Sequence, residues 1–143
     1  MDTENGPWYG DEINLVLHGF NSGWSKVHGI WKPNGDKMGK ILLDPSSSVL
    51  VDFNGKGYYS PPEFIWKKSV GPSAIKFLKS NLYGSEYEND LFVGDVNLGN
   101  LYHFELNGDR TSLEIQGKIL KDKIADSHDE IDDSIIFGRT LKK

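Results

Sequence analysis

Cysteine is absent from this chain of 143 residues, which excludes disulfide bonds and thiolate metal sites and leaves the redox compartment undetermined. No apolar run approaches the ~20 residues that a membrane-spanning helix needs, and the acidic start Met1-Asp2-Thr3-Glu4 is not a signal peptide. Basic residues are outnumbered, 16 against 21 acidic ones, for a net charge of −5. We therefore expect no membrane span and no broad binding to nucleic acid, which requires a surplus of positive charge.

The common catalytic fingerprints are missing as well. The sequence contains no nucleophile elbow, no Walker loop and no dinucleotide-binding glycine pattern. Its four histidines lie far apart and at no zinc-ligand spacing: His18, His28, His103 and His128. Nothing in these patterns assigns a catalytic base, and we expect His103, which alternates with aromatic residues, to be a half-exposed strand residue.

Turn residues and aromatics are plentiful, with 16 Gly, 6 Pro and 12% Phe, Trp and Tyr. This composition favours many short strands joined by turns. Apolar or alternating runs bounded by turn signals predict strands at 13–17, 64–66, 73–78, 90–96, 100–106 and 113–120. The last four form one up-and-down antiparallel sheet, so the fold class is all-β: a sandwich, a barrel or a propeller.

Two segments depart from this regular pattern. Residues 31–61 are rich in Gly, Pro, Ser, Asn and Asp, with one apolar run at 41–43, and predict a long excursion with one or two short strands. Residues 124–133 are acidic and polar, which predicts a solvated loop, and a last apolar stub follows at 134–137.

A candidate calcium turn opens the chain. Gly6-Pro7 can present two adjacent backbone carbonyls, because proline cannot donate and its φ is fixed. Asp11-Glu12 adds two hard oxygen ligands, and calcium takes this mix of carbonyls and carboxylates. Taken alone, the same residues are also an ordinary turn and a polar entry to a strand, so both interpretations remain open.

Two further positions have alternative interpretations. Glu63 follows Pro61-Pro62, so it is either a metal ligand or the residue that opens a strand. Trp66, Trp24 and Trp31 are expected to pack in the core, because aromatic side chains dominate core burial. Trp66 is also a candidate for a place beside a cofactor.

Several segments together resemble the glucose/sorbosone dehydrogenase family, the soluble sugar dehydrogenases that use pyrroloquinoline quinone (PQQ). They are ENGP at 4–7, GDEINLV at 10–16, GFNSGW at 19–24, EFIW and VGPSAIKF within 63–77, and YENDLFVGDVNLGNLYHFELN at 87–107. These enzymes are six-bladed β-propellers. The resemblance therefore implies a partial β-propeller of about two blades of antiparallel four-stranded sheet, with a long irregular insertion.

The implied organisation is a single incomplete propeller domain over residues 1–143. Residues 1–30 would end one blade and carry the calcium turn, and residues 31–61 would be the insertion. Residues 62–120 would form a nearly complete blade, and residues 121–143 would begin the next.

The resemblance also implies two metal sites. The carbonyls of Gly6 and Pro7 would hold a calcium ion that binds the quinone, and Glu12, Ser22 and Glu63 would hold a second, structural calcium. At the second site, another ligand is Asp in some family members, whereas the aligned position here is about Lys32.

For the quinone itself, Trp66 matches a tryptophan that lies near it. Asn97 stands where the enzymes have a lysine that contacts it, so a neutral amide replaces a positive charge.

The implied function is a fragment of a PQQ-dependent aldose dehydrogenase, which oxidises a sugar by hydride transfer to a calcium-bound quinone. The catalytic His and Arg of the family belong to sequence upstream of Met1, so no catalytic residue is assigned here and the chain alone should be inactive. The alternative is a non-catalytic propeller segment that serves calcium-dependent binding or structure, which Asn97 favours.

The implied partners are the sugar substrate of the complete enzyme and either the remaining blades or other copies of this chain. About two blades of six would leave strand edges exposed, and such edges favour association. Complete family members are often exported, so the compartment stays undetermined.

Overall fold

The computed structural model describes residues 1–41, 50 and 53–140. This part of the chain is all-β, as predicted, and contains no α-helix; hence no helix in it has the length and apolar character to cross a membrane. It has three short 3-10 turns, at Phe53–Gly55, Ser85–Tyr87 and His128–Glu130. Its strands are β1 Asp2–Glu4, β2 Tyr9–Asn14, β3 Phe20–Asn21, β4 Trp31–Asn34, β5 Lys37–Ile41, β6 Tyr58–Tyr59, β7 Phe64–Lys68, β8 Pro72–Phe77, β9 Leu91–Asp95, β10 Asn100–Leu106, β11 Leu113–Glu114, β12 Ile124–Ala125 and β13 Ile136–Arg139.

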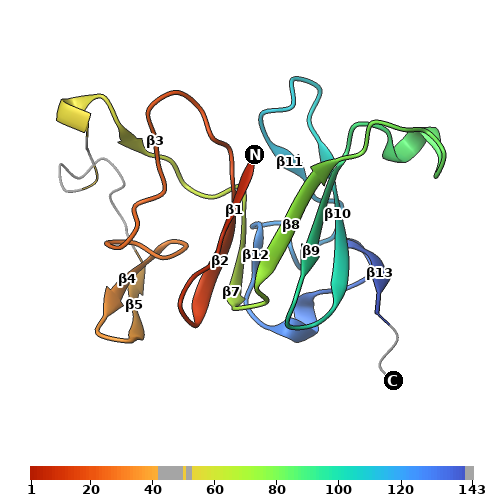
Figure 1. Cartoon of the computed structure of the whole chain (residues 1–143). Coiled ribbons are helices and arrows are strands. Elements are labelled where there is room, and N and C mark those ends of the chain that lie inside the picture. Colours follow the sequence, from red (N-terminus) through yellow and green to blue (C-terminus); the bar gives the residue numbers. More distant parts are fainter. Residues whose placement is uncertain (42–49, 51–52, 141–143) are drawn as a thin grey trace.

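The first sheet has the order β1-β2-β7-β12 and lies in the middle of the molecule (Figure 1). Strands β1, β2 and β7 are antiparallel, whereas β12 runs parallel to β7. The predicted strand at 13–17 begins four residues earlier than expected, because residues 9–14 pair with β7 and are all buried. Val16 and Leu17 instead lie in an exposed connection.

The second sheet has the order β11-β10-β9-β8, and β13 pairs with the first residues of β10. The predicted up-and-down arrangement of four consecutive strands is therefore confirmed, although β11 is only two residues long. The all-β architecture contains no closed barrel in its described part and is consistent with a partial propeller. The predicted domain boundaries stay a prediction; the structure places β7, which falls inside 62–120, in the first sheet beside β2.

The prediction of a solvated loop at 124–133 is wrong at its start. Ile124 and Ala125 form β12 and pair with Ile65 and Trp66, and Ala125 is buried. Ile131 is buried further along the same segment. The prediction failed because the segment is mainly acidic and polar, so its few apolar residues gave no strand pattern. Those apolar residues nevertheless pack in the core.

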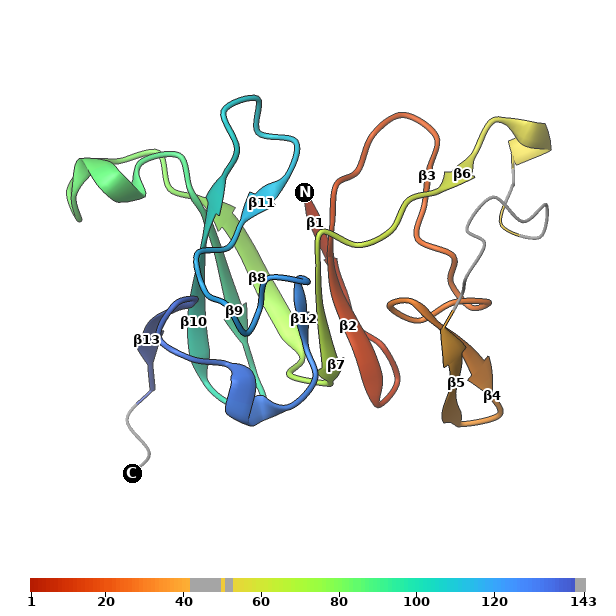
Figure 2. The ribbon, with the colours of Figure 1, turned by 180° about the vertical axis from the view of Figure 1, so that it is seen from behind.

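Residues 15–41, 50 and 53–60 form an outlying part on the far side of β2 from the second sheet (Figures 1 and 2). Here β3 pairs with β6 in parallel, and β4 pairs with β5 as a hairpin. One or two short strands were predicted for residues 31–61, whereas the described part of that range has three, β4, β5 and β6. Of the apolar run at 41–43, Ile41 ends β5, and Leu42 and Leu43 lie outside the described residues.

The main core lies between the two sheets and is built around aromatic rings. Phe64 and Trp66 of β7 meet Phe104 and Tyr102 of β10, with ring centroids 5.1 Å apart for Phe64–Phe104 and 5.0 Å for Trp66–Tyr102. Because side chains alternate along a strand, Ile65 points to the opposite face of β7, where it packs in a second cluster with Tyr9 and Trp31. Strand β7 is thus covered on both faces, and it joins the outlying part to the two sheets.

Candidate functional site

Three strand connections meet at one end of the two sheets, the lower end in Figure 1: 5–8 between β1 and β2, 69–71 between β7 and β8, and 96–99 between β9 and β10. Asp11, which is fully buried, joins the first two. Its Oδ1 accepts a hydrogen bond from the Gly6 backbone N–H at 2.9 Å. Its Oδ2 accepts three more at 2.8 Å each, from the Ser69 hydroxyl and from the backbone N–H groups of Val70 and Gly71.

Backbone hydrogen bonds add the third connection. The N–H of Val96 donates to the Gly71 carbonyl, and the N–H of Asn97 donates to the Val70 carbonyl, both at 3.1 Å. Asn97 is exposed. The structure therefore brings the predicted cofactor residues Gly6, Pro7 and Asn97 to the same end of the molecule.

The turn at Gly6 has room only for glycine. A Cβ atom built on Gly6 would lie 1.8 Å from the backbone oxygen of Tyr9, far inside van der Waals contact. Pro7 follows at the exposed tip of the hairpin. Together with the bond to Asp11, this close approach holds the Gly6 backbone in one conformation.

Glu12 is a buried carboxyl beside this turn, only 3% exposed. It accepts hydrogen bonds from the Asn14 side-chain amide at 3.0 Å and from the Gly29 backbone N–H at 2.5 Å. Burial raises the pKa of Glu12 to about 7; the two hydrogen bonds act against the shift, and the nearby carboxylates of Glu4 and Asp11 add to it.

One buried oxygen near Glu12 has no partner in the described part of the chain. The Asn14 side-chain oxygen is buried and has no hydrogen-bond partner among the described residues. A cavity of about 10 Å³ borders both Gly6 and Glu12, close to the volume that a single small sphere such as a water occupies. Asn14 does not line this cavity, and calcium ligation by Glu12 stays a prediction.

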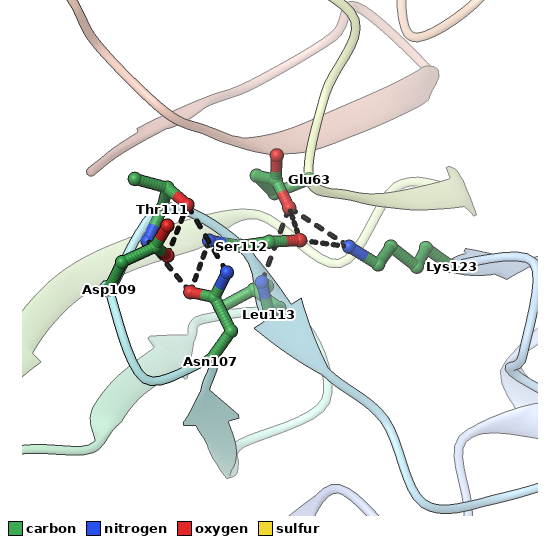
Figure 3. Close-up of polar contacts among 7 residues, drawn as sticks. All are labelled: Glu63, Asn107, Asp109, Thr111, Ser112, Leu113 and Lys123. Atoms are coloured by element: carbon green, nitrogen blue, oxygen red, sulfur yellow. Dashed lines mark hydrogen bonds and ion pairs between the residues drawn. The ribbon is translucent and has the colours of Figure 1, made fainter.

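Glu63 lies in a different network (Figure 3). Its Oε2 accepts hydrogen bonds from the Ser112 hydroxyl at 2.7 Å, the Lys123 ammonium at 2.9 Å and the Leu113 backbone N–H at 3.2 Å. Burial works to raise the pKa of Glu63, but these bonds and the positive charge of Lys123 hold it below its usual value. Lys123 thus neutralises Glu63 where a metal ion was predicted to do so, and metal ligation by Glu63 stays a prediction.

The other residues of the predicted second calcium site lie on other segments of the chain. Ser22 is half-buried in the loop after β3, and Lys32 is exposed on β4. Within the described ranges, no three His, Cys, Asp or Glu side chains form a group that could hold a metal ion. The assignment of Glu12, Ser22 and Glu63 to one site stays a prediction.

Trp66 occupies the main core. It is fully buried, with its ring centroid 4.9 Å from that of Phe64 and 5.0 Å from that of Tyr102. Its indole N–H has no hydrogen-bond partner in the part of the chain that is described. The expected packing role is what this geometry shows, and contact with a cofactor stays a prediction.

Sequence analysis missed two features of this end of the molecule. It treated Asp11 only as a metal-ligand candidate, although this residue joins two connections that are about 60 residues apart. The expectation that Trp24 packs in the core is wrong: Trp24 is 60% exposed, and its ring stacks on that of His28 with centroids 4.5 Å apart beside the Gly6–Pro7 turn. The exposed loop position of Trp24, within a Gly-rich turn, was the available signal.

Comparison with known proteins gives a family. Residues 1–137 match the family described as Glucose / Sorbosone dehydrogenase. The aldose sugar dehydrogenase YliI of Escherichia coli (strain K12) is 27% identical over 121 residues, which cover 85% of this chain and 29% of that protein. The chain therefore spans less than a third of the length of this relative. No solved structure gives a significant match.

Proposed function

We propose, since this chain belongs to the glucose/sorbosone dehydrogenase family, that it forms the calcium-binding part of a PQQ-dependent aldose dehydrogenase. The similar E. coli protein is an aldose sugar dehydrogenase, which supports a sugar as the substrate class. The observation that carries the proposal is the Gly6–Pro7 turn, tied to the buried Asp11 and lying beside the buried Glu12.

The residues that would hold the metal follow from these contacts. Backbone oxygens of Gly6 and Pro7 would bind the calcium that holds the quinone, and Asp11 would keep the turn in place. Glu12 would belong to the second, structural calcium. When bound, the quinone supplies a hydride acceptor and calcium supplies a Lewis acid. The contribution of this chain is to bind and to orient.

Proton abstraction from the sugar hydroxyl is not assigned to any residue here. The family base is a histidine outside the matching segments, and a base contributes typically ~10²–10⁴-fold to the rate. We therefore expect residues 1–143 to show little or no turnover alone. Two observations do not support a complete cofactor site in this chain: Trp66 is fully buried, and Glu63 is paired with Lys123.

The second candidate function is a non-catalytic propeller segment for calcium-dependent binding or structure. It is favoured by Asn97, an exposed neutral amide at the position where the enzymes carry a quinone-contacting lysine. The loss of that positive charge weakens attraction for an anionic quinone. Either function would bring this chain together with the remaining blades or with further copies of itself through its sheet edges.

Calorimetric titration with calcium, and then with PQQ in calcium, tests the proposal. We expect calcium binding, followed by quinone binding that EDTA abolishes. Gly6→Ala should remove both, because its Cβ has no room, whereas Gly108→Ala is the matched control, since a Cβ there meets nothing within 4 Å.

The outcomes separate the candidates. Calcium binding without PQQ binding would leave only the calcium-dependent structural function. Absence of calcium binding, or equal binding by the Gly6→Ala and Gly108→Ala variants, would contradict both.

A further inference from the structure

A pocket of about 300 Å³ lies beside the Gly6–Pro7 turn, on the side away from the two sheets. Three segments enclose it: the tip of the β1–β2 hairpin with Pro7 and Trp8, the loop with Trp24 and His28, and the tip of the β4–β5 hairpin with Asp36. Its volume is at the lower end of the ~300–1,000 Å³ range of small-molecule sites. A ligand of about one ring's size fits this volume.

Two tryptophans on the pocket wall are exposed to an unusual degree. Trp8 is 76% exposed and Trp24 is 60% exposed, although both are large and apolar. Exposed apolar surface gathered around a groove marks a binding site more often than a random position. The wall therefore offers flat aromatic faces to a ligand.

The Trp24 ring is restrained by contacts with buried residues. Its ring stacks on that of His28, with centroids 4.5 Å apart and planes 16° apart. His28 is only 7% exposed and packs against Tyr9, whose ring centroid is 5.4 Å away. The Tyr9 hydroxyl in turn donates to the Lys37 carbonyl of β5 at 3.2 Å. Because these contacts restrain the indole before any ligand arrives, binding loses less conformational entropy.

The polar groups of the pocket favour a neutral ligand with hydroxyl groups. Asp36 is the one carboxylate on its wall, and no Lys or Arg lines it among the described residues. Burial lowers the pKa of His28, so its ring is neutral at pH 7, and neither ring nitrogen has a partner within the described chain. An anionic ligand would meet only a like charge here, whereas a hydroxyl can donate to Asp36.

We propose that this pocket, with Trp8, Trp24 and Asp36 in its wall, is a binding site for a neutral sugar ring. The ring would lie against an indole with its C–H face, and its hydroxyls would bond to Asp36. The pocket shares Pro7 with the proposed calcium turn, whereas Gly6, Glu12, Trp66 and Asn97 do not line it. It rests on the proposed function for the choice of sugars as the ligand class. It would hold a glycosyl unit without taking part in the chemistry.

The four tryptophans of the chain allow a direct test. Their indole N–H signals are followed by ¹H–¹⁵N NMR while D-glucose or maltotriose is added to residues 1–143 in EDTA, without PQQ. We expect saturable shifts for Trp8 and Trp24 and none for Trp31 and Trp66, which are 5% and 0% exposed.

Trp24→Ala and Trp8→Ala should each weaken sugar binding by about fivefold, because a well-placed aromatic contact contributes about 1 kcal/mol. Tyr83→Ala is the matched control, an exposed aromatic residue (68%) outside the pocket. Both tryptophans lie on the surface, so the spectra of their variants should keep the dispersion of the folded chain.

Each result decides for or against the site. Sugar-dependent shifts that persist when calcium and PQQ fail to bind would support this site and contradict the proposed function. Calcium and PQQ binding without shifts at Trp8 and Trp24 would overturn the sugar site alone. Broadening of the same two signals with protein concentration, and not with sugar, would identify the pocket as a contact between copies and overturn the sugar site.

Discussion

At the scale of single residues, the neighbouring buried carboxyls Asp11 and Glu12 make different contacts. Asp11 faces Gly6 and the 69–71 connection, and its oxygens accept four hydrogen bonds. Glu12 faces the opposite side of β2, where Asn14 and Gly29 donate to it. Since side chains alternate across a strand, the Asp-Glu pair cannot place both carboxyls at one ion, and only Glu12 borders the small cavity.

Asp11→Ala should lower the free energy of unfolding by about 3 kcal/mol, because buried N–H donors lose their acceptor at about 1–3 kcal/mol each. Urea denaturation at neutral pH measures the loss. The control is Asp133→Ala, whose side chain is 87% exposed and pairs only with Arg139 at the surface. Equal midpoints for the two variants would contradict the structural role of Asp11.

Glu12 predicts a pH dependence with a definite sign. Its folded pKa of about 7 lies above the ordinary value of 4.5 for a glutamate, so the folded state binds the proton more tightly than the unfolded state does. The stabilising contribution of this pKa shift is therefore fully present below pH 4.5 and is lost as pH rises through about 7. The free energy of unfolding should fall by on the order of 3 kcal/mol in total.

Urea denaturation between pH 5 and pH 8 in EDTA measures this loss, and the difference from Glu12→Gln isolates it. His28, whose pKa burial lowers, acts in the opposite direction and is common to both proteins. A difference that does not change with pH would contradict the assignment to Glu12.

At the scale of elements, the connections at the candidate site are held by carboxylates that cap turns. Asp95, the last residue of β9, accepts hydrogen bonds from the backbone N–H groups of Leu98 at 2.6 Å and Gly99 at 2.8 Å. Its other oxygen accepts the Tyr102 hydroxyl at 2.6 Å, across the hairpin on β10. One side chain thus fixes the turn that carries Asn97 and ties it to the core.

Asp95→Ala should loosen this turn first. The N–H groups of Leu98 and Gly99 should exchange with solvent at least about tenfold faster. The free energy of unfolding should fall by about 1–3 kcal/mol, because the Tyr102 hydroxyl is left buried without an acceptor. Hydrogen exchange followed by NMR measures both. Tyr102→Phe is the control, since it removes one bond of the three and should leave the turn amides protected; equal exchange in the two variants would contradict the role of Asp95.

At the scale of the whole molecule, two sheets share one core and a third part is attached to its side. Phe64 and Trp66 join the first sheet to the second, whereas Ile65 joins β7 to the cluster of Tyr9 and Trp31. Strand β7 therefore contacts both the core between the two sheets and the cluster of the outlying part. The exposed edges of these sheets are the surfaces through which association is proposed.

Phe64→Ala should destabilise both sheets together by about 3–5 kcal/mol, because it leaves a cavity beneath Trp66 and Phe104. Near-ultraviolet circular dichroism during thermal unfolding should show one transition at a lower midpoint. Ile41→Ala is the control, since Ile41 lies half exposed on β5, outside both core clusters. Separate transitions for the two sheets in the unsubstituted chain would contradict a shared core.

Much of the second sheet could be predicted from the sequence, because its strands are consecutive and joined by local turns. The alternation of NLYHFEL and the turn at 97–99 already specify the hairpin of β9 and β10. The first sheet could not be predicted in this way. Its β2 contains the polar pair Asp11-Glu12, and its β12 has two residues in an acidic segment, so only long-range pairing makes them strands.

The sequence by itself determined the all-β class, the absence of thiolate chemistry, the place of the glycine turn and the family, because composition and spacing are local properties. Only the tertiary structure decided what each polar side chain faces. Glu63 and Lys123 are 60 residues apart, and their ion pair exists because β12 packs beside β7. The tryptophan pocket exists for the same physical reason, since three segments that are distant along the chain close around it only after the strands have paired.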